Sequence, residues 1–309
     1  MQEKTMKSVL ITGGTGSFGQ AFVNHLLGTN AERIVIYSRG EHRQEEMARH
    51  TGNGRVRYFI GDVRDRKRLE LAMRGIETVV HAAALKIVPI AEYNPTECVA
   101  TNIGGAENVV LASIAAGVKK VIALSTDKAV NPINLYGATK LCAEKVFIAA
   151  NNLAAGKTLF SVVRYGNVVG SQGSVLPLFK KIASEGGSLP VTDVRMTRFW
   201  IKMDQAIDLV NLAHKNMKGR EIFVPKIPSV NIVSLAEAIS PMWHISGIRP
   251  GEKLHEALIS RDEAAYVIDK ADHFVITTER QREVDINIAY KSNTNARFLS
   301  VDEIREMVA

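Results

Sequence analysis

The strongest constraint on the fold is the alternation of short apolar runs with helix-like segments over the first half of the chain. The apolar runs are rich in Val and Ile and show little polar alternation, which is typical of strands buried on both faces of a parallel sheet. We expect strands at Ser8–Thr12, Arg33–Tyr37, Val56–Ile60, Thr78–His81, Lys120–Ser125 and Leu159–Arg164. We expect helices between them at Phe18–Leu27, Arg43–Arg49, Arg66–Met73, Pro95–Ala116 and Tyr136–Ala150. This order predicts an α/β fold with a doubly wound parallel sheet and right-handed crossovers.

The rhythm breaks after about Gly166, where glycines and prolines gather. A helix at Asp204–Asn216 and a strand at Ile222–Val224 are expected to return to the sheet, whereas residues 226–280 show no sustained alternation. We therefore predict a nucleotide-binding domain of residues 1–166 with 203–225. Residues 167–202 with 226–309 are predicted to form a smaller α/β cap that binds substrate and a C-terminal segment.

Composition narrows the classes of partner and compartment. The formal charge of +7 favours polyanionic partners, among them small phosphorylated ligands. The two cysteines, Cys98 and Cys142, lie far apart, which argues against a disulfide scaffold and for a reducing compartment. The eight histidines show no metal-ligand spacing, so no metal site is expected.

Neither a targeting segment nor a membrane span is expected. The first residues run straight into an apolar strand without a signal-peptide core, and no stretch approaches the roughly 20 apolar residues of a spanning helix. We therefore expect a soluble, cytoplasmic protein that has no membrane partner.

A glycine-rich turn follows the first strand. Gly13, Gly16 and Gly19 form a G-x-x-G-x-x-G spacing before an apolar helix. Glycines let the backbone turn tightly and approach a pyrophosphate, and the helix N-terminus offers free N–H groups to it. Because the turn lies in the first βαβ unit, it predicts a dinucleotide site that also uses Thr15, Ser17 and Phe18.

The end of the second strand bears on which nucleotide binds. Ser38, Arg39 and Arg43 stand where NAD-binding chains usually carry an acid, and a hydroxyl with guanidinium groups suits a 2′-phosphate. NADP is therefore predicted, the alternative being that the two arginines are solvated surface charges. Asp62 and Val63 are placed to meet the adenine, although Asp62 could instead cap a helix.

A polar cluster follows the fifth strand. Thr126, Asp127 and Lys128 come directly after it, and Tyr136 and Lys140 stand one helical turn apart. An ammonium beside a phenol lowers the phenol pKa, so we expect a tyrosine base with a pKa near neutrality. A desolvated Lys128 could act as a neutral base and a buried Asp127 as an acid. Taken singly, Asp127 could cap a helix and Lys128 could be a surface charge.

These motifs resemble the extended short-chain dehydrogenase/reductase superfamily, which has a Rossmann-type fold. The resemblance rests on the glycine turn, on His81-Ala82-Ala83-Ala84, on Asn102 and on Tyr136-x-x-x-Lys140. Four segments covering residues 84–89, 123–140, 195–200 and 248–256 resemble, more narrowly, the inverting UDP-N-acetylglucosamine 4,6-dehydratases. The match spans almost the whole chain, and its central block, Ala123–Lys140, is highly specific.

The resemblance implies that UDP-N-acetylglucosamine is oxidised at C4, loses water across C5/C6 and regains hydride at C6, with inversion at C5. Lysine beside Asp127, where retaining dehydratases carry glutamate, marks the inverting group. The expected product is UDP-2-acetamido-2,6-dideoxy-beta-L-arabino-hex-4-ulose, feeding nonulosonic acid or other surface-glycan sugars. The division of acid and base work between Asp127 and Lys128 stays open. A homo-oligomer, from dimer to hexamer, is also implied.

The resemblance completes the expected binding residues. The cofactor is also expected to contact Ala82, Lys86, Leu124, Ser125, Tyr136, Lys140 and Val168. The sugar nucleotide is expected at Lys86, Asn167, Thr192, Arg198, Arg249 and Glu252, with Arg198 alternatively in a salt bridge inside the cap. His255 and Glu256 either join this site or only brace its loop.

Two rival functions remain. A sugar-nucleotide 4-epimerase would keep Tyr136 and Lys140 but has no use for Asp127 and Lys128. A nucleotide-sensing or RNA-binding protein predicts a basic stripe with interleaved aromatics. Here basic residues are scattered and aromatics are 6% of the chain, so no nucleic-acid partner is expected.

Overall fold

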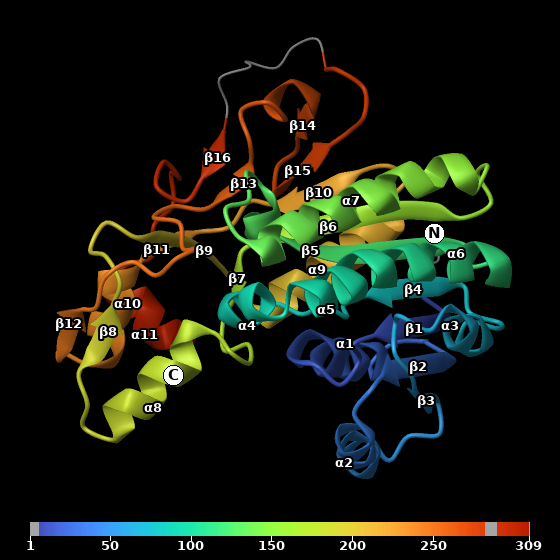
Figure 1. Ribbon diagram of the computed structural model, residues 1–309, viewed down its shortest axis with the longest axis horizontal. Helices are drawn as coiled ribbons and strands as arrows, with labels where there is room; N and C mark the ends of the chain where they lie inside the picture. The colour runs from blue at the N-terminus through green and yellow to red at the C-terminus, as the bar shows by residue number, and fades with distance from the viewer. Residues whose placement is uncertain (1–5, 282–288, 309) are drawn as a thin grey trace.

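A nine-stranded sheet forms the centre of the protein (Figure 1). The computed structural model describes residues 6–281 and 289–308. Residues 1–5, where no targeting segment is expected, lie outside the described residues. The sheet has the order β14-β15-β10-β6-β5-β4-β1-β2-β3. Its strands are β1 Ser8–Thr12, β2 Arg33–Ser38, β3 Val56–Ile60, β4 Thr78–His81, β5 Lys120–Thr126, β6 Leu159–Tyr165, β10 Ile222–Pro225, β14 Val267–Asp269 and β15 His273–Ile276.

The strands from β3 to β10 are parallel. The predicted doubly wound Rossmann-type sheet is therefore confirmed, and the six expected strands of the first half match within one residue at each end. In the register of this sheet, Thr126 stands beside Tyr165, and His81 beside Ala123. The carboxyl ends of β4, β5 and β6 thus meet at one edge, where doubly wound sheets bind their ligands.

Helices cover both faces of the sheet (Figure 1). Helices α3, α6 and α7 pack in sequence against one another, and α1 packs against α9. They are α1 Ser17–Leu27, α2 Glu41–Thr51, α3 Arg66–Ala72, α4 Val88–Tyr93, α5 Pro95–Val99, α6 Gly105–Ala116, α7 Leu135–Leu153 and α9 Met203–Asn216. The main apolar core lies between these helices and the sheet, with side chains such as Leu10, Ile36, Val80 and Val162 fully buried.

A second apolar cluster, centred on Trp200, Leu189 and Leu235, lies in the smaller part of the molecule (Figure 1). Its helices are α8 Val175–Ser184, α10 Ile232–Ile239 and α11 Val301–Val308. Its short strands are β7 Asn167–Val168, β8 Leu189–Val191, β9 Thr197–Ile201, β11 Ser229–Asn231 and β12 Trp243–Ile245. Two further short strands, β13 Ala257–Ile259 and β16 Tyr290–Lys291, pair with each other and pack against the main core.

The C-terminal segment contributes more to the large sheet than its sequence indicates. Strand β15 pairs antiparallel with β10, and β14 pairs with β15. Both strands fall in residues 226–280, where no sustained alternation is visible, and in the range predicted for the cap. The division into residues 1–166 with 203–225 and 167–202 with 226–309 stays a prediction, with β14 and β15 as sheet strands inside its second part.

The helix expected at Pro95–Ala116 is interrupted by a π-helical turn at Ala100–Gly104. This helical run of 22 residues is long and apolar enough to cross a membrane by length and composition alone, and half of its most apolar stretch is buried. The expectation that no stretch approaches such a length is therefore corrected. In the structure, α6 packs between α3 and α7.

Candidate active site

A cavity of about 1200 Å³ opens at the carboxyl edge of the sheet. It is bounded on one side by the turns after β1, β2, β4 and β5 and on the other by the smaller part of the molecule. Of the site residues expected from the sequence, only Asp127 does not line the cavity, because its side chain is completely buried beneath it.

The glycine turn is built for close backbone contact. Gly13 has a φ of 68°, and a Cβ there would stand 2.9 Å from the backbone of Ala83. A Cβ on Gly19 would stand 2.5 Å from Gly14, so glycine is what lets α1 pack against the turn. Helix α1 has no side-chain cap at Gly16, which leaves N–H groups of its first turn for an anion at the cavity wall.

The residues at the end of β2 suit the far end of a dinucleotide. Ser38, Arg39 and Arg43 line the cavity, and the Arg39 side chain is 57% exposed. Asp62 accepts hydrogen bonds from Arg64 and lies 3.9 Å from Arg39. The N-cap of α3 is Asp65, so the alternative of Asp62 as the helix cap is wrong.

Unsatisfied hydroxyls support a ligand in this cavity. The Oγ1 of Thr101 and the Oγ atoms of Ser125 and Ser174 are buried and have no hydrogen-bond partner among the described residues. All three residues line the cavity. Because buried polar groups are normally paired, these atoms and the open helix terminus fit a nucleotide cofactor.

The catalytic candidates lie on two packed elements. Asp127–Ala129 forms a 3₁₀ turn, and the Thr126 hydroxyl caps it by accepting from the Lys128 N–H. Asn134 caps α7 by accepting from the Gly137 N–H, and its side-chain amide donates to the Gly251 carbonyl 2.8 Å away. The sequence thus places Tyr136 in the first turn of α7, beside the 3₁₀ turn.

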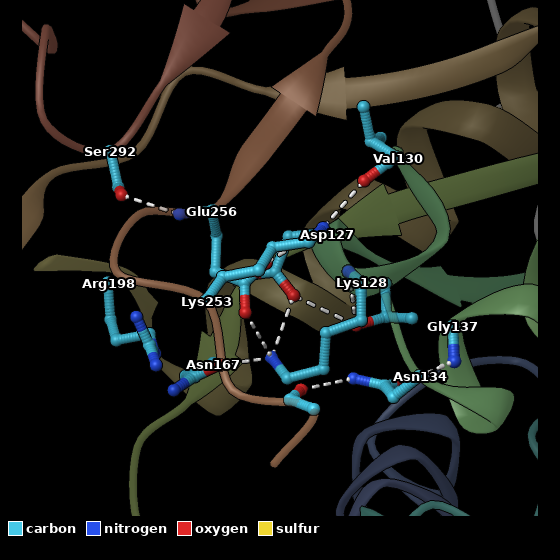
Figure 2. Close-up of polar contacts among 12 residues, drawn as sticks. Asp127, Lys128, Val130, Asn134, Gly137, Asn167, Arg198, Lys253, Glu256 and Ser292 are labelled. Atoms are coloured by element: carbon cyan, nitrogen blue, oxygen red, sulfur yellow. Dashed lines mark hydrogen bonds and ion pairs between the residues drawn. The ribbon is translucent and has the colours of Figure 1, made fainter. Parts of the chain in front are cut away.

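Lys128 is held among oxygen atoms (Figure 2). Its Nζ lies 3.0 Å from Asp127 Oδ1, 3.2 Å from Asn167 Oδ1 and 3.5 Å from Glu256 Oε1. The Asp127 Oδ2 atom is buried and has no hydrogen-bond partner in the described chain. The alternatives in which Asp127 caps a helix and Lys128 is a surface charge are therefore wrong.

The protonation of this pair follows from its contacts. Burial alone would lower the pKa of Lys128, but the charges of Asp127 and Glu256 outweigh it and hold this pKa above its usual range. Burial raises the pKa of Asp127. The charge of Lys128 lowers this pKa, and the charge of Glu256 raises it further. These charges favour the ammonium form of Lys128 in this structure, so desolvation alone does not produce the neutral amine expected from the sequence.

Tyr136 and Lys140 both line the cavity, but their electrostatics differ from the prediction. Burial raises the pKa of Tyr136 to about 12, although the Lys128 charge and a hydrogen bond with Thr126 act in the other direction. Burial lowers the pKa of Lys140 to about 8, and its Nζ donates to the Leu124 carbonyl at 2.7 Å. The expected shift of the Tyr136 pKa toward neutrality by Lys140 is therefore wrong for this structure.

The residues expected to hold the sugar nucleotide face the same cavity from the smaller part. Arg198 donates to the carbonyls of Thr197 and Leu254. It forms no salt bridge with an acid in the described chain, so the alternative of a salt bridge inside the cap is wrong. Arg249 and Glu252 form an ion pair 3.4 Å long on the loop that Asn134 holds. Thr192 is buried, with its hydroxyl directed at Met196.

The structure separates the two residues whose roles the sequence leaves open. His255 Nδ1 is hydrogen-bonded with the Thr197 hydroxyl and braces the loop. Glu256 lines the cavity and contacts Lys128. Lys253, which has no role in the sequence interpretation, pairs with Glu256 at 3.4 Å. The local sequence does not predict these contacts, because the segment 253–256 is far from Lys128 along the chain and comes close to it only in the folded protein.

The chain resembles known proteins over nearly its full length. The family described as "Polysaccharide biosynthesis protein" matches residues 9–278. The UDP-N-acetylglucosamine 4,6-dehydratase (inverting) of Campylobacter jejuni serotype O:2 is 51% identical, over 98% of this chain and 97% of that one. A UDP-glucose 4-epimerase of Rickettsia rickettsii is 39% identical over 98% and 95%. The X-ray structure of Pen from Bacillus thuringiensis has a TM-score of 0.93 and 36% identity, with 99% of each chain covered.

Proposed function

Because this chain belongs to the polysaccharide biosynthesis proteins and, within that family, to the sugar-nucleotide dehydratases, we propose that it is an NADP-dependent UDP-N-acetylglucosamine 4,6-dehydratase that inverts C5. These dehydratases are members of the extended short-chain dehydrogenase/reductase superfamily. The observation that carries the proposal is the pair of buried Asp127 and partly buried Lys128 at the cavity, 3.0 Å between Oδ1 and Nζ. An epimerase needs no acid and base at C5 and C6. A dehydratase needs both.

Tyr136 and Thr126 would act at C4. Thr126 would hydrogen-bond the C4 oxygen. Tyr136 would act as its phenolate, the form that the Lys128 charge and the Thr126 hydrogen bond favour against the effect of burial on its pKa, and would take the hydroxyl proton as the C4–H bond breaks. The chemistry that bound NADP supplies is acceptance of the C4 hydride and its later return to C6. The resulting C4 ketone acidifies the C5 proton, so a base at C5 becomes effective.

The Asp127–Lys128 ion pair can become the required acid and base by a single proton transfer. Moving one proton from Lys128 Nζ to Asp127 Oδ1 gives a neutral amine and a neutral carboxylic acid. The amine would take the C5 proton, and the acid would protonate the departing C6 hydroxyl, which leaves as water. Both groups then return to the ion pair. The proton that Tyr136 took from the C4 hydroxyl would go back to the substrate at C5, on the opposite face, which inverts that centre and restores Tyr136.

The cofactor would be held by the glycine turn at one end and by Ser38, Arg39 and Arg43 at the other. The presence of basic side chains and a hydroxyl at the end of β2 supports NADP. The diphosphate and uridine of the substrate would be held by Asn167, Thr192, Arg198, Arg249 and Glu252, with Lys86 between cofactor and sugar. A cytoplasmic location, a homo-oligomer and a role in surface-glycan synthesis belong to the same proposal.

One incubation separates the dehydratase from the epimerase. Purified protein is mixed with NADP and UDP-N-acetylglucosamine in deuterated water, and the product is examined by mass spectrometry and NMR. We expect loss of one water, one solvent deuteron at C5 and an inverted C5 configuration. An unchanged skeleton with an altered C4 would instead establish the epimerase, the name carried by relatives 39% identical to this chain.

A further inference from the structure

Glu256 brings a second buried carboxylate to Lys128 from a separate segment of the chain (Figure 2). The residue directly precedes β13, in the C-terminal half of the chain, and is 3% exposed. Its backbone N–H donates to Ser292 Oγ at 3.0 Å, which fixes where the side chain begins. The carboxylate therefore reaches Lys128 from an anchored position.

The charges around the Lys128 ammonium are arranged unequally. Asp127 lies 3.0 Å from the ammonium on the same 3₁₀ turn, and Glu256 lies 3.5 Å from it on a different segment of the chain. Three positive groups affect the pair of Lys128 and Glu256. Arg198 faces both residues, and Lys253 faces Glu256. Lys86 is close enough to Lys128 for the Lys128 charge to lower its pKa. Tyr136 is the remaining titratable neighbour.

The two carboxylates cannot do the same work. Asp127 can accept a proton from Lys128, since burial and the Glu256 charge both raise its pKa. The charges of Lys128, Arg198 and Lys253 oppose the effect of burial on Glu256 and hold its pKa below the usual range. Glu256 thus stays an anion while Asp127 and Lys128 exchange a proton.

We propose that Glu256 is a positioning residue for the dehydration step, holding the Lys128 amine at C5 and stabilising the positive charge that it gains there. The proposal rests on the proposed function, since it assigns the C5 proton to Lys128. It gives Glu256 the task that an orienting carboxylate performs for a catalytic histidine: it fixes the base and favours its protonated form without taking a proton itself.

The test compares Glu256→Gln with Glu256→Asp and with Glu237→Gln, in which the same change is made on the exposed face of α10. We expect Glu256→Gln to lower kcat for water loss by roughly 10²-fold to 10³-fold, the cost of removing one preorganised electrostatic contact. KM is expected to change little. The aspartate variant, which keeps the charge, is expected to recover part of the rate, and Glu237→Gln to match the unaltered protein.

A second readout needs no turnover. Lys128 is labelled with acetic anhydride across a range of pH, and the modified peptide is quantified by mass spectrometry. Because the neutral amine reacts, loss of the Glu256 charge should accelerate labelling by roughly tenfold for each unit by which the Lys128 pKa falls. A merely structural role would not change this rate in a variant that melts at the same temperature.

The outcomes distinguish the two proposals. If the unaltered protein releases no water from UDP-N-acetylglucosamine, the proposed function fails, whereas faster labelling in Glu256→Gln still supports the charge effect on Lys128. Unchanged labelling together with unchanged kcat in Glu256→Gln would overturn the role of Glu256. Equal loss of kcat in the aspartate and glutamine variants would also contradict it, because the charge would then be irrelevant.

Discussion

At the scale of single residues, the cavity concentrates charges whose partners come from distant parts of the chain. Lys128 is partly buried and has Asp127 beside it in sequence, but Asn167 and Glu256 complete its surroundings. A sequence shows that a lysine follows an aspartate after a buried strand. It does not show how many carboxylates meet that lysine, and this number decides whether the resting group is an amine or an ammonium.

Arg39 provides a residue-scale test of the cofactor. We predict that Arg39→Ala raises the Kd for NADP by roughly 10-fold to 100-fold, since a charge-assisted hydrogen bond to phosphate is worth about 1.5–3 kcal/mol. The Kd for NAD should stay nearly unchanged, because NAD lacks the 2′-phosphate. Calorimetric titration of both nucleotides measures the two constants.

Arg74→Ala, on the exposed surface outside the cavity, serves as the control and should alter neither Kd. An Arg39→Ala protein that still binds NADP as tightly as before would assign the 2′-phosphate to other residues.

At the scale of elements, the site depends on the contact between the 3₁₀ turn and α7. Gly137 lies where the two elements touch, and a Cβ on it would stand 2.2 Å from the Lys128 carbonyl oxygen. Glycine at this position therefore permits the turn that carries Asp127 and Lys128 to lie directly against the helix that carries Tyr136. The groups proposed to act at C5 and C6 are thus held in a fixed position relative to the tyrosine proposed to act at C4.

We predict that Gly137→Ala separates these elements and lowers kcat by about 10²-fold, the usual consequence of displacing reacting groups by about 1 Å. Steady-state assay of water loss gives the rate, and thermal unfolding shows whether the fold persists. Gly104→Ala is the matched control, because a Cβ there meets nothing within 4 Å. That variant should keep full activity and gain up to about 1 kcal/mol in helix stability. Equal activity of the two variants would contradict the role given to Gly137.

Elements that depend on a local sequence pattern are predicted well, and elements that depend on distant partners are not. Buried parallel strands are continuous apolar runs, so β1, β3 and β4 match their predicted bounds. The π-helical turn at Ala100–Gly104 escapes prediction because its residues fit a regular helix equally well. The strands after residue 226 are short and pair with distant partners, as β12 does with β8 and β15 with β10. Such pairing leaves little trace in the local sequence.

At the scale of the whole molecule, one buried guanidinium joins the sheet, helix α7 and the C-terminal segment. Arg164 on β6 is 1% exposed and forms two hydrogen bonds with Glu144 of α7 and two with Glu263. It also donates to the Leu258 carbonyl of β13. Because β13 begins directly after Glu256, this arrangement fixes the C-terminal wall of the cavity relative to α7.

We predict that Arg164→Met lowers the free energy of unfolding by about 3–5 kcal/mol, because it leaves Glu144 and Glu263 without their buried partner. Urea denaturation followed by circular dichroism measures the change. Arg195→Met removes a paired arginine whose side chain is 67% exposed, and should lower the free energy of unfolding far less than Arg164→Met does. A similar loss of unfolding free energy in both variants would show that the burial of Arg164 does not determine its contribution to stability.

The late position of Glu256 in the chain has a consequence for synthesis. A ribosome that has translated as far as α9 has already released the glycine turn, the acid–base pair and the tyrosine helix. The nascent polypeptide then carries the residues of the proposed cofactor site, but its Lys128 still lacks Glu256, and three strands of the large sheet, β10, β14 and β15, are still to be made. The proposed chemistry on the sugar is therefore expected only after translation has nearly finished.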